Sequence, residues 1–230
     1  MTNIQAINPQ QHMVIKIADN RYFKQSKAQH FAPLVVQEFT MASHYYPIVF
    51  IKNADTGEFK AVALLGLKPG QNLFYSDQGW RADYVPKVLE LYPFVLHHEQ
   101  DSSRSMVCID SDSGLVNEQH GEPLFDAQGQ QTQWLTNKAE QLVVHVENNY
   151  LTQHFIQSLL SHGLLIAQTL TLQLPNQEPY ELNGLYVINE QALNQLPEAG
   201  FLTLRKTGAL PAIYAVLNSM SRIEQLAKLS

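Results

Sequence analysis

Aromatic residues form the densest cluster of potential ligand-binding side chains in this 230-residue sequence. Between positions 45 and 94 they include Tyr45, Tyr46, Phe50, Phe74, Tyr75, Trp80, Tyr84, Tyr92 and Phe94, interleaved with Pro47, Pro86 and Pro93. Aromatic rings supply contact area at low entropic cost, and rigid prolines beside them can shape a groove for a peptide or an apolar ligand. We therefore predict that the segment from Tyr46 to Phe94 forms a contact surface.

Packing in a hydrophobic core explains part of the same set of rings. We assign Phe50, Phe74 and Phe94 to the core. The predicted ligand-binding residues are Tyr46, Trp80, Tyr84 and Tyr92.

The nine histidines raise the question of a metal site. His97, His98 and Glu99 are consecutive, but neighbouring positions on a strand point to opposite faces and cannot grip one ion without a bend. His145 and Glu147 would share a face only in an extended segment, and neither group matches the spacing of a zinc-protease helix. We read these histidines as surface or hydrogen-bonded residues.

The run from Asp110 to Gly114 resembles the start of a calcium-binding loop. Such a loop needs Gly at its sixth position and Glu at its twelfth, whereas here Gly comes fifth and the twelfth residue is Gly121. This run predicts a turn after a strand, and the sequence predicts no metal site. A metal-assisted enzyme built on His97, His98, Asp110 or His145 stays as the alternative hypothesis.

The sequence gives little support for a catalytic nucleophile or for a phosphate-binding site. Cys108 is the only cysteine, and it lies in an apolar run where a free thiol behaves as a small buried hydrophobe. The sequence has no G-x-S-x-G turn, no Walker loop and no dinucleotide fingerprint. We therefore predict no catalytic residue and no cofactor.

The charge composition excludes some classes of partner. Lys and Arg number 15 against 21 Asp and Glu, so the chain has no basic stripe to neutralise the phosphates of a nucleic acid. Charged residues make up only 16% of the chain, and glutamine replaces much of the usual charge. No stretch approaches the ~20 apolar residues of a bilayer span, and the N-terminal residues lack the pattern of a secretion signal. With a single thiol and no disulfide, these features predict a cytoplasmic protein without membrane insertion.

The first half of the chain shows hairpin signals. Two β-rich runs, Ile48–Ile51 and Phe59–Leu65, flank a polar turn that contains Gly57, and the second run is apolar enough to be buried on both faces. A helix is expected within Pro33–Tyr45, and a third strand at Asn72–Tyr75. Further expected elements are a short helix that ends before Pro93 and strands at Phe94–Leu96 and Ser105–Ile109.

The second half adds a hairpin and helices. Apolar residues from Leu151 to Leu160 recur at helical spacing, with Gly163 placed to end that helix, while Leu142–Val146 fits either a strand or a helix. A hairpin from about Leu170 to Ile188 and a helical tail follow. The predicted fold class is α+β: an antiparallel sheet with hairpins, packed helices and a helical C-terminal tail. We expect an N-terminal arm at 1–30 and a single unit at 31–230, in which any internal boundary falls near 111–137.

Several short motifs are spread along the chain: Tyr46-Pro47-Ile48-Val49-Phe50, Val62-Ala63-Leu64-Leu65-Gly66-Leu67, Gly70-Gln71-Asn72-Leu73-Phe74, Trp80, Tyr84-Val85-Pro86, Tyr92-Pro93-Phe94, Gly121-Glu122-Pro123-Leu124-Phe125, Leu182-Asn183-Gly184-Leu185-Tyr186 and Thr207-Gly208-Ala209-Leu210. In these motifs the chain resembles SapC, a known family of bacterial proteins. The resemblance extends from about Phe31 to Leu226. The family takes its name from a gene neighbourhood for a paracrystalline surface layer, associated with serum resistance and surface-protein export, and relatives occur beside outer-membrane receptors and oxygenase- or halogenase-like enzymes. The resemblance transfers no catalytic residue.

The expected function is that of a cytoplasmic, non-catalytic accessory or peptide-binding protein, which the resemblance relates to surface-layer formation or export. Its expected partner is a protein or peptide. Two alternatives stay open: the metal-assisted enzyme, and a subunit of an oligomeric assembly. The sequence does not fix the oligomeric state.

Overall fold

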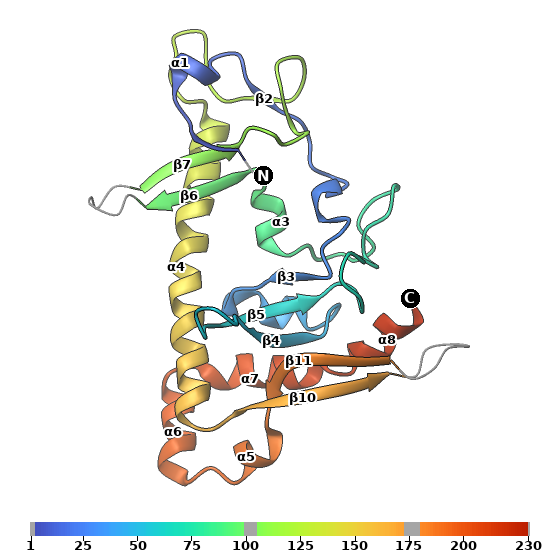
Figure 1. The fold of residues 1–230 in the computed structure, drawn as a ribbon. Coiled ribbons are helices and arrows are strands. Elements are labelled where there is room, and N and C mark those ends of the chain that lie inside the picture. Colours follow the sequence, from blue (N-terminus) through green and yellow to red (C-terminus); the bar gives the residue numbers. More distant parts are fainter. Residues whose placement is uncertain (1–2, 99–104, 173–179, 230) are drawn as a thin grey trace. The chain divides into compact units, whose positions relative to one another are not determined.

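The computed structural model describes residues 3–98, 105–172 and 180–229, and the chain divides into two compact units (Figure 1). The first unit takes in the chain up to Arg21 together with Leu89–Glu147. The second takes in Tyr22–Val88 and the chain from Asn148 onward. Each unit is thus assembled from two separate stretches of sequence, and residues 111–137 all belong to the first.

Two small antiparallel sheets provide the strands of the first unit, with orders β1-β7-β6 and β8-β2-β9. The strands are β1 (Ile4–Ala6), β2 (Lys16–Ile17), β6 (Phe94–His98), β7 (Ser105–Asp110), β8 (Val116–Asn117) and β9 (Glu122–Pro123). The first unit also contains two short helices, α1 (Pro9–His12) and the end of α3 (Lys87–Leu91). The first two residues of α3 belong to the second unit. The predicted strands at Phe94–Leu96 and Ser105–Ile109 and the short helix before Pro93 are confirmed.

The core of the first unit collects apolar side chains from these strands, from α3, from the residues that follow β9 and from the start of a long helix, α4 (Gln133–Ser161). Its buried members are Ile17, Leu91, Phe94, Ile109, Leu124, Phe125, Leu135 and Leu142. Phe94 packs edge-on against Trp134, with 5.8 Å between the ring centroids. The prediction that Phe94 is a core residue is confirmed.

A five-stranded antiparallel sheet with the order β10-β11-β4-β5-β3 forms the centre of the second unit (Figure 1). Its strands are β3 (Phe31–Pro33), β4 (Ile48–Lys52), β5 (Phe59–Leu64), β10 (Leu165–Leu172) and β11 (Tyr180–Ile188). The first predicted hairpin is β4–β5, in which Ile48 lies opposite Ala63 and Lys52 opposite Phe59. Every residue of β5 except Lys60 is buried, as predicted. The second predicted hairpin is β10–β11; its turn at 175–179 lies outside the described residues.

Helices pack around this sheet. They are η1 (Lys24–Ser26), η2 (Val36–Glu38), α2 (Phe39–Ala42), α5 (Glu190–Asn194), α6 (Glu198–Lys206), α7 (Ala209–Ser219) and α8 (Arg222–Lys228). Helix α7 is tied to the sheet because the Ser219 hydroxyl accepts a 2.9 Å hydrogen bond from the Ile48 amide. Gly208, at φ +73°, makes the left-handed turn between α6 and α7. The helical tail and the α+β class are confirmed.

Helix α4 is longer than predicted. It runs without a break for 29 residues, from Gln133 to Ser161, so Leu142–Val146 is helical and the sequence expectation captured only its C-terminal third. Gly163, at φ +66°, follows its end as predicted. No helix in the described part of the chain is long and apolar enough to span a bilayer.

Two local predictions need correction. Within Pro33–Tyr45, Pro33 belongs to strand β3, and only Val36–Ala42 is helical. The predicted strand at Asn72–Tyr75 is wrong, because those residues form an irregular loop. The reason for the second error lies in the side-chain hydrogen bonds that hold this loop.

Candidate functional site

A row of contacting aromatic rings occupies one region of the second unit. Phe23 meets Trp80 edge-on at 5.7 Å between ring centroids, and Trp80 stacks on Phe74 at 6.0 Å with an interplanar angle of 22°. Phe74 meets Tyr46 edge-on at 4.6 Å, and Tyr45 follows at 6.2 Å. These are favoured geometries for aromatic pairs. The row joins residues up to 57 positions apart (Phe23 to Trp80) into one cluster.

Hydrogen bonds fix the orientation of these rings. The Trp80 indole N–H donates to the Tyr46 hydroxyl at 2.7 Å, and that hydroxyl donates to the backbone carbonyl of Tyr84. The Tyr46 side chain is fully buried. Its hydroxyl is therefore committed to holding Trp80 and the backbone at Tyr84.

A buried carboxylate, Glu38, ties the same region together. Its Oε1 accepts from the Tyr84 hydroxyl at 2.6 Å and from the Lys87 backbone N–H at 2.7 Å. Its Oε2 accepts from the Val35 backbone N–H at 3.0 Å. A buried carboxylate is tolerated only when its oxygens are hydrogen-bonded, and here three donors meet that need. The bonds join η2, the loop before α3 and the first residue of α3.

The loop that carries Phe74 and Trp80 is held by side-chain amides. The Gln71 Oε1 accepts from the backbone N–H groups of Leu67 and Lys68 at 3.0 and 3.3 Å. The Asn72 Oδ1 accepts from the N–H groups of Phe74 and Tyr75 at 3.0 and 3.2 Å. Amide side chains that bond nearby backbone compete with strand ladders, which explains why the β-prone residues after Asn72 do not form a strand.

Five aromatic residues of this region are partly exposed, and we call them together the aromatic surface: Phe23, Tyr45, Tyr75, Trp80 and Tyr84. Charged side chains contact two of these tyrosines. The Tyr75 hydroxyl donates to Asp77 at 2.8 Å and the Tyr45 hydroxyl to Asp83 at 3.3 Å, while the Lys27 ammonium lies 5.8 Å from the centroid of the Tyr75 ring. Both signs of charge are present, so apolar contact rather than net charge must select a partner here.

Phe23 has an unusual backbone. At φ +49° it lies in the left-handed region, and it is the only non-glycine residue to do so in the described part of the chain. Bulky side chains avoid this region, at a cost of about 1–2 kcal/mol. The surrounding structure therefore holds Phe23 against Trp80 in spite of strain, and such strain is concentrated at functional positions.

Of the predicted ligand-binding residues, three come together and one does not join them. Tyr46, Trp80 and Tyr84 share the hydrogen bonds above, with Tyr46 as the buried support. Tyr92 belongs to the first unit, where its hydroxyl donates to Asp110 at 3.1 Å. Burial raises the pKa of the Tyr92 phenol, and the charge of Asp110 adds to the rise.

Phe23 and Glu38 are not among the residues predicted for this site. Phe23 stands in a polar stretch where no pattern marks a left-handed residue. Glu38 did carry a signal, because it is an acidic residue inside the apolar run Leu34–Phe39 and three positions after Val35, the spacing at which a glutamate bonds back to the start of a helix.

A comparison with protein families matches the SapC model over residues 7–226 of the chain. The chain belongs to the SapC family. The match covers parts of both units, including every residue of the aromatic surface. No curated protein and no solved structure matches the chain.

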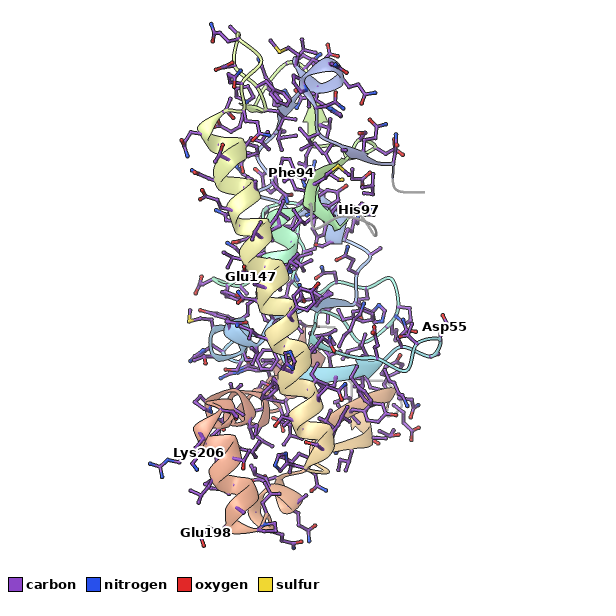
Figure 2. The ribbon with its side chains drawn as sticks, turned by 90° about the vertical axis from the view of Figure 1, so that its left-hand side faces the viewer. Asp55, Phe94, His97, Glu147, Glu198 and Lys206 are labelled. Atoms are coloured by element: carbon purple, nitrogen blue, oxygen red, sulfur yellow. The ribbon has the colours of Figure 1, made fainter. Side chains whose placement is uncertain are left out.

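The histidines of this SapC protein do not gather into a metal site within the residues that the structure describes, where no three His, Cys, Asp or Glu side chains lie together. Figure 2 shows His97 on strand β6 and Glu147 on helix α4. His145 and Glu147 lie two positions apart on that helix and therefore do not share a face. Glu99 lies outside the described residues.

The other candidate groups of this SapC protein are engaged in structure. Asp110 is buried, and its Oδ1 accepts from the backbone N–H groups of Asn3 and Asp112, both at 3.3 Å. The prediction of a turn that follows a strand is thus confirmed. Cys108 is buried, and burial raises the pKa of its thiol, which disfavours the thiolate that a nucleophile needs.

Tyr46 gives the SapC fold a measurable pH dependence. Burial raises the pKa of its phenol, the hydrogen bond from Trp80 lowers it, and the nearby Tyr45 and Glu38 raise it, with a net shift upward. The folded pKa exceeds the unfolded value of 10, so the contribution to stability is complete below pH 10 and falls as the pH rises above it. We expect the free energy of unfolding to fall more steeply above pH 10 in the wild type than in Tyr46→Phe, by up to about 1.4 kcal/mol per pH unit. Urea titrations across that range measure both slopes, and equal slopes would contradict the burial of the phenol.

Proposed function

We propose that this SapC-family protein is a non-catalytic accessory protein that holds an extended, proline-containing peptide segment of a partner protein on the aromatic surface. We infer that this role serves surface-layer formation or export, as the resemblance to the family implies. The observation that carries the proposal is the aromatic surface itself: five partly exposed rings, supported from beneath by the buried Tyr46 and Glu38, with Phe23 held in a strained backbone conformation.

The available chemistry of the surface supports a peptide partner. The Trp80 N–H and the Tyr84 hydroxyl donate their hydrogen bonds to Tyr46 and Glu38, so a partner meets the exposed apolar parts of these two rings rather than their donors. Proline-containing segments are already extended before binding and dock against such rings with little loss of entropy.

The ionisable groups beside the surface support binding over catalysis. Glu38 is enclosed by three hydrogen bonds from the protein, and the upward shift of the Tyr46 pKa moves the titration of its phenol further from neutral pH. General acid–base catalysis requires a group whose pKa lies near the working pH and whose proton can reach a substrate. The proposal places the protein in the cytoplasm, where a reducing environment suits the lone Cys108.

Fluorescence titration tests the proposal. In a Trp134→Phe background, Trp80 is the sole tryptophan and reports on the aromatic surface. The probes are a synthetic proline- and leucine-rich peptide and a peptide of equal length made of glycine and serine. We expect a saturable change in Trp80 emission with the first probe only. The variant Tyr75→Ala removes one ring of the aromatic surface and is expected to weaken binding of the proline-rich peptide about tenfold, which is ~1.4 kcal/mol.

The matched control is Tyr150→Ala, which removes a tyrosine that is 61% exposed on helix α4, outside the aromatic surface. It is expected to leave the titration unchanged. No saturable response to the proline-rich peptide, or an equal response to both peptides, would overturn the proposal.

A further inference from the structure

The two edges of the five-stranded sheet are built differently. At one edge, β3 has three residues and ends at Pro33, and short strands and prolines are features that prevent edge-to-edge pairing. At the other edge, β10 has eight residues, Leu165–Leu172, with no proline and no charged side chain. One edge is therefore protected against pairing and the other is open to it.

Strand β10 is an exposed edge strand. Within the described residues its only ladder is the one with β11. Ala167, Gln168, Thr169 and Thr171 are exposed, and Ile166 exposes 39% of its surface. Figure 1 shows β10 on the outer side of β11, at the margin of the sheet. An edge of this length leaves a row of backbone N–H and C=O groups available to another strand.

The outer half of this hairpin has little support from its own sheet. Strand β11 pairs with β4 only at Leu185 and Tyr186, whereas the ladder between β10 and β11 continues to Leu172 opposite Tyr180. That part is a two-stranded ribbon, with a register shift between Gln168 and Leu170. Two-stranded ribbons are marginally stable alone, so an added strand would stabilise it.

The charge pattern indicates which strand can be added. No Asp, Glu, Lys or Arg occurs between Glu147 and Glu178, a stretch of 30 residues (positions 148–177) in a chain with 16% charged residues and a net charge of −6. When two copies of one chain meet across a two-fold axis, residues near the axis approach their own copies, so a charge there faces a like charge. A neutral edge avoids that repulsion, whereas a different partner would be steered by complementary charge, which this edge lacks.

We propose that β10 pairs antiparallel with β10 of a second copy of this chain, so that two five-stranded sheets join into one continuous sheet across a two-fold axis. The backbone groups of Leu165–Leu172 supply the hydrogen bonds, and the uncharged side chains of the strand meet the uncharged side chains of the second copy. This interaction uses a different surface from the aromatic one, so either proposal can fail without the other.

Paired charge variants and sedimentation test the dimer. We expect wild-type protein to sediment at twice its 26.1 kDa mass. Lysine is a natural blocker of strand edges, so the double variant Ala167→Lys/Thr171→Lys is expected to be monomeric, with a dissociation constant raised about 100-fold or more. Ala167→Glu/Thr171→Glu is expected to be monomeric for the same reason. Mixing the two variants is expected to restore the dimer, because opposite charges then face each other.

The matched control is Gln191→Lys/Gln195→Lys, which adds the same charge at exposed positions in and just after α5 and is expected to remain dimeric. Circular dichroism verifies that each variant is folded. If a strand variant unfolds, hydrogen exchange on the wild type decides instead, since dimerisation must slow exchange of β10 backbone amides as concentration rises. A wild type that is monomeric at every concentration, lysine variants that stay dimeric, or β10 exchange that is independent of concentration would each overturn the proposal.

Discussion

Gly66→Ala is expected to lower the free energy of unfolding of the second unit by about 3 kcal/mol, the upper end of the usual cost of overpacking. A Cβ atom at position 66 would lie 2.2 Å from the Gln71 carbonyl oxygen and 2.9 Å from its carbonyl carbon. Both are backbone atoms, so no side-chain rotation can relieve the contact. The backbone φ of Gly66 is ordinary, which makes the cost purely steric.

The strand end and the loop cannot easily move apart at this point. The His30 carbonyl accepts hydrogen bonds from the Leu65 and Gly66 N–H groups at 2.8 and 3.0 Å, which fixes Gly66 on one side. On the other side, Gln71 is fixed by the bonds of its side chain to Leu67 and Lys68. A shift of Gln71 would break these bonds and displace Phe74 and Trp80, which follow in the same loop.

Urea unfolding in the Trp134→Phe background measures this effect, because Trp80 emission then reports on the second unit alone. The control is Gly200→Ala in helix α6, where a new Cβ would make only ordinary contacts, the nearest at 3.4 Å to the His162 ring. Alanine favours helix over glycine by about 1 kcal/mol, so the control is expected to gain stability. A Gly66→Ala variant as stable as the wild type would show that the Gln71 backbone leaves room for a Cβ atom at position 66.

The successes and errors of the sequence analysis have physical causes. The β4–β5 hairpin was predictable because its signal is local: two β-prone runs and a polar turn in which the Asn53 side chain accepts from the Asp55 and Thr56 N–H groups. The strand expected at Asn72–Tyr75 had the right residues, but the backbone N–H groups of Phe74 and Tyr75 donate to the side chain of Asn72 instead of to a neighbouring strand. Residue propensities do not include that competition.

The candidate site was predictable in part for the same reason. Clustering of rings in the sequence identified Trp80 and Tyr84, but the pairing of Phe23 with Trp80 and the approach of Glu38 to Tyr84 depend on tertiary structure. Helix α4 shows a related limit, since the β-branched pair Val143 and Val144 is exposed on a continuous helix rather than part of a strand. Helical continuity over 29 residues outweighs the local preference of two valines.

Glu38→Ala is expected to cost about 3–5 kcal/mol of the stability of the second unit, because one fully buried donor left without an acceptor costs about 1–3 kcal/mol and two partly exposed donors add to that cost. Three donors lose their acceptor together: the Val35 N–H, the Tyr84 hydroxyl and the Lys87 N–H. The Val35 N–H suffers most, because Val35 is buried and water cannot replace the carboxylate there. Tyr84 and Lys87 are partly exposed, so water can satisfy them in part.

Glu38→Gln keeps the volume of the side chain and changes only its hydrogen bonds, so it separates these two contributions to stability. Glutamine keeps one oxygen that can accept from Tyr84 and Lys87, but it turns an N–H₂ group toward the Val35 N–H, where two donors then face each other. We expect a loss of about 1–3 kcal/mol, the cost of one unsatisfied buried group, and therefore a clear gap between the two variants. Glu58→Gln, at an exposed position in the β4–β5 turn, is the control and is expected to change stability by less than ~0.5 kcal/mol.

A double-mutant cycle with Tyr84→Phe links Glu38 to the aromatic surface. If the 2.6 Å bond between the Tyr84 hydroxyl and Glu38 stabilises the fold, Tyr84→Phe costs less in Glu38→Ala than in the wild type, with a coupling energy of about 1–2 kcal/mol. Glu38→Ala is also expected to shift Trp80 emission to longer wavelength, because the chain of bonds from Glu38 through Tyr84 and Tyr46 positions the indole. A zero coupling energy together with unchanged Trp80 emission would mean that Glu38 stabilises η2 alone and has no part in shaping the aromatic surface.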